Sequence, residues 1–168
     1  MTLLFAQPYD ISANGFFFET EEEYNEKAAA LRNSSGWPVE EFEIQFIDGE
    51  SIDAELFEAL SIQQGNFGAF LNEVDTWSDE EKAILIIAVG KAGYEFTLGT
   101  DIPDEFDIDL YEIDNLRNLA MQFVEEGLFG SIPESIQHYL DYDAIARDLS
   151  MDYSEITINR TRYVYRCC

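Results

Sequence analysis

Cations, histidine and cysteine are scarce in this sequence. Its 168 residues include nine lysines and arginines against 35 aspartates and glutamates, which gives a formal net charge of −26. The single histidine, His138, excludes a histidine-rich metal site and leaves only one possible base for a Ser-His-Asp triad. Cys167 and Cys168 are adjacent and cannot staple a fold, so we expect a reducing, cytoplasmic environment.

Long apolar segments and nucleotide-binding motifs are also missing. The longest apolar run, residues 83–89, is far shorter than the roughly 20 residues of a membrane span, and the start of the chain has no basic signal-peptide region. Neither Gly-x-Gly-x-x-Gly nor a Walker A sequence is present. The acidic stretch 104–112 lacks the glycine-centred calcium loop. We therefore expect no enzyme, no cofactor and no dedicated metal site.

The negative charge is comparable with that of a DNA duplex. A compact globule of this length is roughly 40 Å across. The same length of B-DNA carries about 24 phosphate charges. Nine scattered cations cannot neutralise phosphates, which excludes an ordinary nucleic-acid binder and favours partners that themselves bind nucleic acid. The alternative is an acidic protein whose charge only prevents association.

Periodicity and turn signals predict an α+β chain of three small domains: residues 1–60, 61–103 and 104–168. In the first, strands at 3–6, 16–18 and 42–47 are expected to form a small sheet on one helix that starts at the capping-box pattern of residues 20–23. In the second, a short helix at 66–74 precedes a longer one that opens with the capping box of residues 78–81 and ends near Gly93. Residues 95–101 fit a helix or an edge strand.

The third domain combines helices with a hairpin. The spacing of apolar residues predicts one helix over residues 110–126, with Gly127 as its stop signal, and shorter helices at 133–139 and 142–149. Alternating apolar residues on either side of Asn159 and Arg160 predict a hairpin.

The carboxylates themselves could carry function by their spacing. Residues four apart on a helix are about 6 Å apart, close to the separation of neighbouring phosphates, and we expect Glu22 with Glu26 and Glu105 with Asp109 to be such pairs. Glu41 and Glu43 have a similar repeat on a strand. The carboxylates expected to line one negative strip are Glu22, Glu23, Glu26, Glu41, Glu43, Asp48, Glu50, Glu55, Glu58, Glu73, Asp75, Asp79, Glu80, Asp101, Asp104, Glu105, Asp107, Asp109, Glu112 and Asp114.

Residues 125–149, EEGLFGSIPESIQHYLDYDAIARDL, resemble the hallmark segment of the ArdA antirestriction family. The start LFAQPYD, the segment EEFEIQFID and the terminal hairpin also suit this family. The residues assigned to its antirestriction motif are Gly127, Leu128, Phe129, Gly130, Ile132, Pro133, Tyr139, Asp141, Tyr142, Arg147, Asp148 and Leu149.

The resemblance implies a function that composition alone leaves open. Proteins of this kind come from mobile genetic elements, mimic bent B-form DNA and occupy the DNA-binding groove of type I restriction-modification enzymes, in the specificity and modification subunits. It also implies a curved, elongated protein of three small domains that forms a homodimer through the third domain, with the motif at the interface. The alternative is that the motif aromatics fill the domain's own core. An anti-CRISPR or other anti-defence DNA mimic, a divalent-ion-binding protein and a hydrolase built on His138 are the alternatives.

Overall fold

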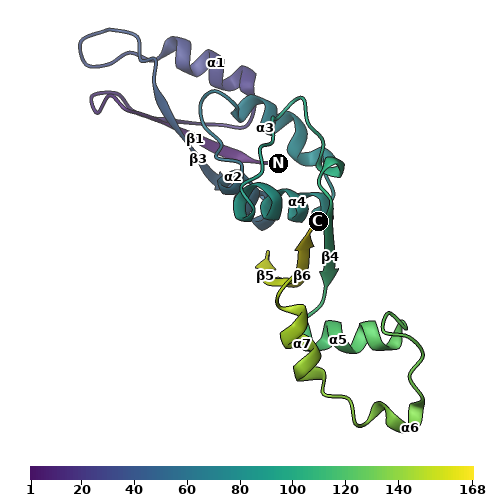
Figure 1. Ribbon diagram of the computed structural model, residues 1–168. Helices are drawn as coiled ribbons and strands as arrows, with labels where there is room; N and C mark the ends of the chain where they lie inside the picture. The colour runs from purple at the N-terminus through teal and green to yellow at the C-terminus, as the bar shows by residue number, and fades with distance from the viewer. The chain divides into compact units, whose positions relative to one another are not determined.

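A computed structural model describes residues 1–168, which form two compact units, Met1–Glu105 and Phe106–Cys168 (Figure 1). Mixed helices and small antiparallel sheets confirm the α+β class. The boundary lies close to the one expected at residue 103. The expected boundary at residue 60 runs through the interior of the first unit, as the packing below shows.

The first unit contains a three-stranded antiparallel sheet in the order β2-β1-β3. Its strands are β1 (Leu3–Pro8), β2 (Phe16–Phe18) and β3 (Phe42–Asp48), which confirms the three strands predicted. Alternate residues face inward, so Leu4, Ala6 and Ile44 are buried whereas Glu43 is exposed. The apolar and polar alternation along β3 therefore determines which carboxylates remain in water.

Helices and helical turns make up the rest of the first unit. They are α1 (Glu21–Ala30), α2 (Ser51–Ala59), α3 (Phe67–Glu73), η1 (Val74–Thr76), α4 (Asp79–Leu85), the π-helical turn η2 (Ile86–Lys91) and η3 (Pro103–Glu105). The helix α2 was not predicted, and residues 95–101 are neither helix nor strand.

Two helix starts follow the predicted capping residues. The Ser78 hydroxyl accepts a hydrogen bond from the Glu81 amide, and the Glu81 carboxylate accepts one from the Ser78 amide, which completes the predicted capping box. At α1 the Thr20 hydroxyl caps the Glu23 amide, but the Glu23 carboxylate accepts from Glu19 instead of Thr20. The capping box predicted at residues 20–23 is therefore only half formed.

An aromatic cluster joins residues from both sides of the expected boundary at residue 60. The Tyr24 ring of α1 lies 4.6 Å from the Phe67 ring of α3 and 5.1 Å from the Phe18 ring of β2, measured between centroids. Gly90 of η2 also approaches Ala59 of α2 so closely that an added Cβ would lie 3.1 Å from the alanine Cβ. Residues 1–60 and 61–103 thus share one core.

The second unit is a three-stranded antiparallel sheet packed on helices. The strands are β4 (Ile108–Glu112), β5 (Ser154–Ile158) and β6 (Thr161–Cys167), in the order β4-β6-β5. The helices are α5 (Leu116–Glu125), α6 (Glu134–Gln137) and α7 (Tyr142–Leu149), and the core combines Leu119 and Phe123 of α5 with Tyr153 and Val164. The hairpin of β5 and β6 and the two short helices confirm those predictions.

The prediction of one helix over residues 110–126 is wrong in its first third. Residues 108–112 are a strand that pairs with β6, and the helix starts only after Asn115, whose side-chain oxygen accepts from the Asn118 amide. Since Asp109 lies on this strand and Glu105 ends η3, the two are not one helical turn apart as expected.

None of the helices has the length and apolar character needed to cross a membrane.

Candidate functional site

Most of the predicted carboxylates are exposed on the two units. In the first unit the exposed ones are Glu22, Glu26, Glu41, Glu43, Asp48, Glu50, Glu58, Asp75, Asp79, Glu80, Asp104 and Glu105. In the second unit they are Asp107, Glu112 and Asp114. Glu22 and Glu26 share α1 at the predicted four-residue spacing, and Glu43 lies on the solvent face of β3 two residues after Glu41.

Five of the predicted carboxylates are partly buried: Glu23, Glu55, Glu73, Asp101 and Asp109. Glu23 forms an ion pair with Lys27 at 2.6 Å, and this contact lowers the pKa of the Glu23 carboxyl. Oε2 of Glu73 is enclosed without a hydrogen-bond partner, and Asp101 accepts from the Thr97 amide at 2.7 Å. Because these side chains are partly enclosed, they are less accessible to a partner.

Asp109 is the predicted carboxylate whose charge is most directly compensated. Its Oδ2 accepts from Nε of Arg166 at 3.0 Å, and a second guanidinium nitrogen contacts the same oxygen. The Arg166 guanidinium also lies 5.1 Å from the centre of the Tyr153 ring. The hydrogen bond to Asp109 raises the pKa of Arg166, so the guanidinium stays charged at neutral pH.

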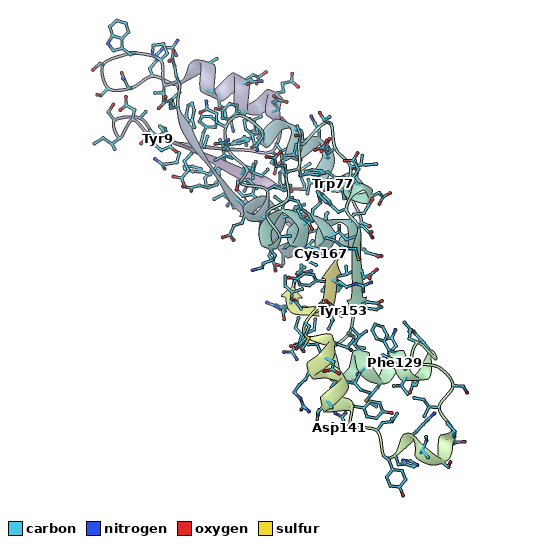
Figure 2. All side chains as sticks on the ribbon, viewed as in Figure 1. Tyr9, Trp77, Phe129, Asp141, Tyr153 and Cys167 are labelled. Carbon is cyan, nitrogen blue, oxygen red and sulfur yellow. The ribbon has the colours of Figure 1, made fainter.

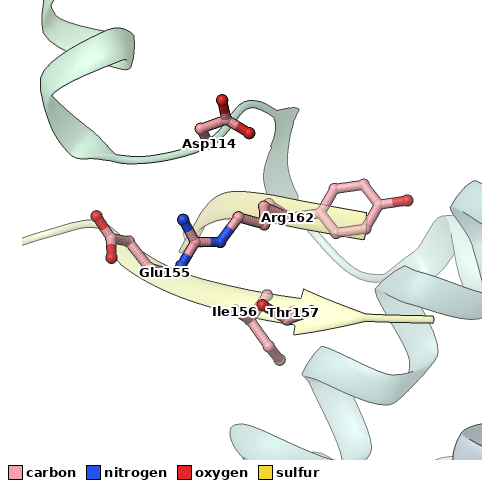
Figure 3. A pocket seen from close by; sticks show the side chains of 6 residues that line it. Asp114, Glu155, Ile156, Thr157 and Arg162 are labelled. Atoms are coloured by element: carbon pink, nitrogen blue, oxygen red, sulfur yellow. The ribbon is translucent and has the colours of Figure 1, made fainter. Parts of the chain in front are cut away.

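A shallow pocket of about 220 Å³ in the second unit brings together two carboxylates and one guanidinium (Figure 3). Arg162 of β6 extends toward Glu155 of β5, and Asp114 lies on the segment before α5 (Figure 3). The Glu155 carboxylate accepts from the Leu116 amide at 2.9 Å and so holds the start of α5. Asp114 therefore shares this pocket with a cation.

The segment of residues 127–130 leaves α5 through a tight turn. The Gly127 amide donates to the Val124 carbonyl and the Leu128 amide donates to the Phe123 carbonyl, which is the Schellman pattern of helix ends. Gly127 and Gly130 have φ of 78° and 92°, which L side chains rarely adopt. Both predicted glycines are therefore needed for the backbone path.

This turn places large apolar side chains in water. Leu128 is 63% exposed, Phe129 52% and Tyr139 85%. Figure 2 labels Phe129 beside the end of α5 and Asp141 before α7, at the two ends of the connecting segment. Because these side chains do not fill the core, the sequence alternative in which the motif aromatics form that core does not hold for Phe129 and Tyr139.

Three of the remaining motif residues stabilise the second unit. Asp141 caps α7 by accepting from the Ala144 amide at 3.0 Å, and Leu149 packs against the core. Tyr142 is half-buried, with the Arg117 guanidinium 5.7 Å from its ring centre. The motif therefore divides into residues that shape this unit and residues that it exposes. Ile132 is half-buried, while Pro133, Arg147 and Asp148 are exposed.

The profile of a family described as antirestriction protein, ArdA, matches residues 12–164. The chain belongs to the ArdA family. No curated protein matches it in a sequence comparison. The matched region includes almost all of both units and the whole motif, which confirms the resemblance inferred from residues 125–149.

Membership of the ArdA family gives the general function. ArdA proteins are antirestriction proteins, which act on restriction-modification enzymes as inhibitors rather than as enzymes in their own right. His138, at the end of α6, is exposed. The structure brings together no group of three or more histidine, cysteine, aspartate or glutamate side chains that could hold a metal ion.

Proposed function

We propose that this ArdA protein mimics B-form DNA and inhibits type I restriction-modification enzymes by occupying the DNA-binding groove of their specificity and modification subunits. The observation that carries the proposal is the exposure of regularly spaced carboxylates, such as Glu22 with Glu26 and Glu41 with Glu43. Their spacing of about 6 to 7 Å is close to that of successive phosphates. A groove that binds phosphates attracts such carboxylates by the same electrostatic force.

The protein acts on the enzyme and not on nucleic acid. It carries 35 acidic residues against nine lysines and arginines. Four of these cations are already used in ion pairs: Lys27 with Glu23, Lys82 with Asp53, Arg117 with Asp143 and Arg166 with Asp109. DNA would be repelled by this charge. Each of the sequence segments 1–60, 61–103 and 104–168 contributes exposed carboxylates to the charge that the enzyme recognises.

The protein acts as a homodimer formed through the second unit. Leu128, Phe129, Ile136 and Tyr139 are exposed on one connecting segment between α5 and α7. A cluster of exposed aromatic and aliphatic residues is typical of a protein interface. It is also the least acidic part of the motif, which suits contact between two copies that each carry −26.

Competition between this protein and duplex DNA for a purified type I methyltransferase tests the proposal. We expect displacement of DNA, with an affinity that falls steeply between low and moderate salt concentration because the attraction is mainly electrostatic. Binding that does not compete with DNA, or that is indifferent to salt, contradicts the mechanism. A plasmid-restriction assay beside a CRISPR interference assay identifies the class of enzyme inhibited.

Two variants of equal net charge test whether the position of the carboxylates matters. In the first, Glu22, Glu26, Glu41 and Glu43 are changed to glutamine. In the control, the exposed residues Glu95, Glu125 and Glu126 are changed to glutamine and Asp152 to asparagine. We expect the first to weaken inhibition more than the second. Equal effects would show that only total charge is recognised.

A further inference from the structure

Two loops at one end of the first unit are hydrogen-bonded to each other. One joins β1 to β2 and the other joins α1 to β3, and both project beyond the helix and the sheet (Figure 1). The Asn33 side-chain amide donates to Asp10 at 2.9 Å, and the Ser34 amide donates to the Ser12 hydroxyl at 3.1 Å. We call residues 9–12 and 33–37 the tip.

The second loop of the tip is held in one conformation by Asn33. The side-chain oxygen of Asn33 accepts from the Ser35 amide at 3.0 Å and from the Trp37 amide at 2.9 Å. The Asn33 amide donates to the Trp37 carbonyl at 3.0 Å, and Gly36 supplies the positive φ of 80° that the turn requires. Trp37 is therefore presented on a closed, pre-ordered loop.

The tip is apolar and almost uncharged in a very acidic protein. Ile11 is 99% exposed, Trp37 69% and Tyr9 65%, and Figure 2 labels Tyr9 at this end of the unit. Residues 33–39 carry no charge. Asp10 is the one charged residue of the tip, and its carboxylate accepts hydrogen bonds from Ser12 and Asn33. These hydrogen bonds lower the pKa of Asp10.

Exposed carboxylates lie on both sides of this uncharged segment in the sequence. Glu22 and Glu26 come before it on α1, and Glu41 and Glu43 follow it at the start of β3. The loop of Trp37 thus connects the two elements whose carboxylates have the spacing of phosphates. An uncharged aromatic side chain flanked in sequence by two groups of anions resembles, in its chemistry, a base beside its phosphates.

We propose that the tip is the uncharged part of the interface with the restriction-modification enzyme, and that Trp37 enters an apolar, aromatic-lined recess beside the enzyme's basic groove. The proposal rests on the proposed DNA mimicry, because the carboxylates bring the tip to that groove. DNA-modifying enzymes that extrude a base receive it in a pocket of this chemistry, between aromatic or apolar side chains.

The physical argument is one of desolvation. Ile11 gains nothing from contact with a basic surface, and Trp37 gains only cation–π contacts there, while burying either side chain against it would desolvate cations. Burial of these side chains in an apolar recess instead favours binding in proportion to the apolar area removed from water. Tryptophan is also enriched among the residues that dominate the binding energy of interfaces. Because the loop is already ordered, little conformational entropy is lost when Trp37 binds.

Dissociation constants for a purified type I methyltransferase, measured over a series of salt concentrations, test this inference. The variants are Trp37→Ala, Trp37→Phe and the control Met151→Ala, which removes a side chain that is 83% exposed in the second unit. We expect Trp37→Ala to weaken binding at least about tenfold at every salt concentration, as for a central interface residue. Its salt dependence should equal that of the wild type, whereas Trp37→Phe and Met151→Ala should stay within about threefold of the wild type.

A second measurement observes Trp37 directly. The protein contains two tryptophans, so the Trp77→Phe variant labelled with 5-fluorotryptophan has a single ¹⁹F resonance, from Trp37. We expect unlabelled enzyme to shift this resonance and to remove its sensitivity to exchange of H2O for D2O.

The outcomes separate the two proposals. Trp37→Ala binding within twofold of the wild type, or an unchanged ¹⁹F resonance in the complex, overturns the role of the tip. The role of the tip is also overturned if Trp37→Ala changes the salt dependence of binding as much as the glutamine variant of Glu22, Glu26, Glu41 and Glu43 does. The tip would then act through charge. Failure of the wild-type protein to compete with DNA instead overturns the mimicry, whatever Trp37→Ala does.

Discussion

Lys82 and Asp53 form a buried ion pair, with Nζ 2.6 Å from Oδ1, that joins α4 to α2. The two residues are only 3% and 1% exposed, and the Glu50 carboxylate lies 3.7 Å from the same nitrogen. A chain with nine lysines and arginines thus uses one of them in the core. This contact joins residues on either side of the boundary expected at residue 60. Residues 1–105 therefore share one core.

We expect Lys82→Met to lower the free energy of unfolding by about 3–5 kcal/mol, because it leaves the Asp53 carboxylate buried without its partner. Urea denaturation followed by circular dichroism measures the change. Lys91→Met is the matched control, since Lys91 is exposed and forms no ion pair, and it should change stability by less than about 0.5 kcal/mol. A loss as small as in the control contradicts a structural role for the pair.

The cost of Lys82→Met should depend on pH. Burial raises the pKa of Asp53 above its ordinary value of 3.8, against the opposing effect of Lys82. Removing Lys82 raises the pKa further, so the folded variant binds a proton that the unfolded chain releases. The stability difference from the wild type is therefore largest near neutral pH and shrinks as the pH falls toward about 4. A difference that grows on acidification has the wrong sign.

Gly127→Ala should destabilise the second unit through its backbone alone. An added Cβ at Gly127 meets no atom within 4 Å, but φ is 78°. We expect a loss of about 1 kcal/mol in the free energy of unfolding. Gly65→Ala is the control, because it also meets no atom within 4 Å and lacks the positive φ. Equal stability of the two variants would exclude backbone strain as the reason for this glycine.

Replacing Phe129 and Leu128 by serine should affect association rather than folding. The side chains are 52% and 63% exposed, so the loss of packing within one subunit is small. If the segment forms the proposed dimer interface, the double variant sediments as a monomer at concentrations at which the wild type is a dimer, with an unchanged circular dichroism spectrum. Met151→Ala serves as control for loss of an exposed apolar side chain. A double variant that stays dimeric places the interface elsewhere.

The helices and strands that local sequence signals predicted are those marked by residues within or next to the element itself. The Ser78 capping box, the cap of α7 at Asp141 and the alternation along β3 each contain the information within a few residues. The helix α2 was missed because Glu50, at its N-terminus, makes no side-chain capping bond. Residues 110–112 of β4 fall within the segment predicted as helix, because the strand pairs with Tyr163 and Tyr165 of β6, some 50 residues further along the chain.

Exposure of the candidate site could be predicted better than its contacts. A carboxylate on the polar side of a strand or helix stays in water, so Glu26 and Glu43 could be placed from periodicity. Ion pairing of Asp109 with Arg166 joins residues 57 apart, and the tip joins Asn33 to Asp10, 23 residues away. Such pairs depend on topology, which the sequence pattern does not specify.

The pairing of Asp109 predicts that neighbouring carboxylates contribute unequally to inhibition. Asp107 and Asp109 belong to the same segment and were both expected to present charge, but only Asp109 is in contact with a guanidinium. The Arg166 charge cancels much of the potential of Asp109 at the distance of a bound enzyme, whereas Asp107 retains its full charge. Asp107→Asn should therefore weaken binding to a type I methyltransferase more than removal of the whole ion pair does in the double variant Asp109→Asn, Arg166→Gln, at low salt and by less than about threefold, since the charge is spread over many residues. The double variant keeps the net charge and should bind like the wild type. Asp109→Asn alone uncovers the Arg166 cation, so it should weaken binding about as much as Asp107→Asn, and it should also lower stability slightly, by the 0–1 kcal/mol typical of a partly exposed pair. Loss of binding in the double variant as large as in Asp107→Asn would mean that the enzyme recognises the ion pair itself, and would exclude simple charge mimicry on β4.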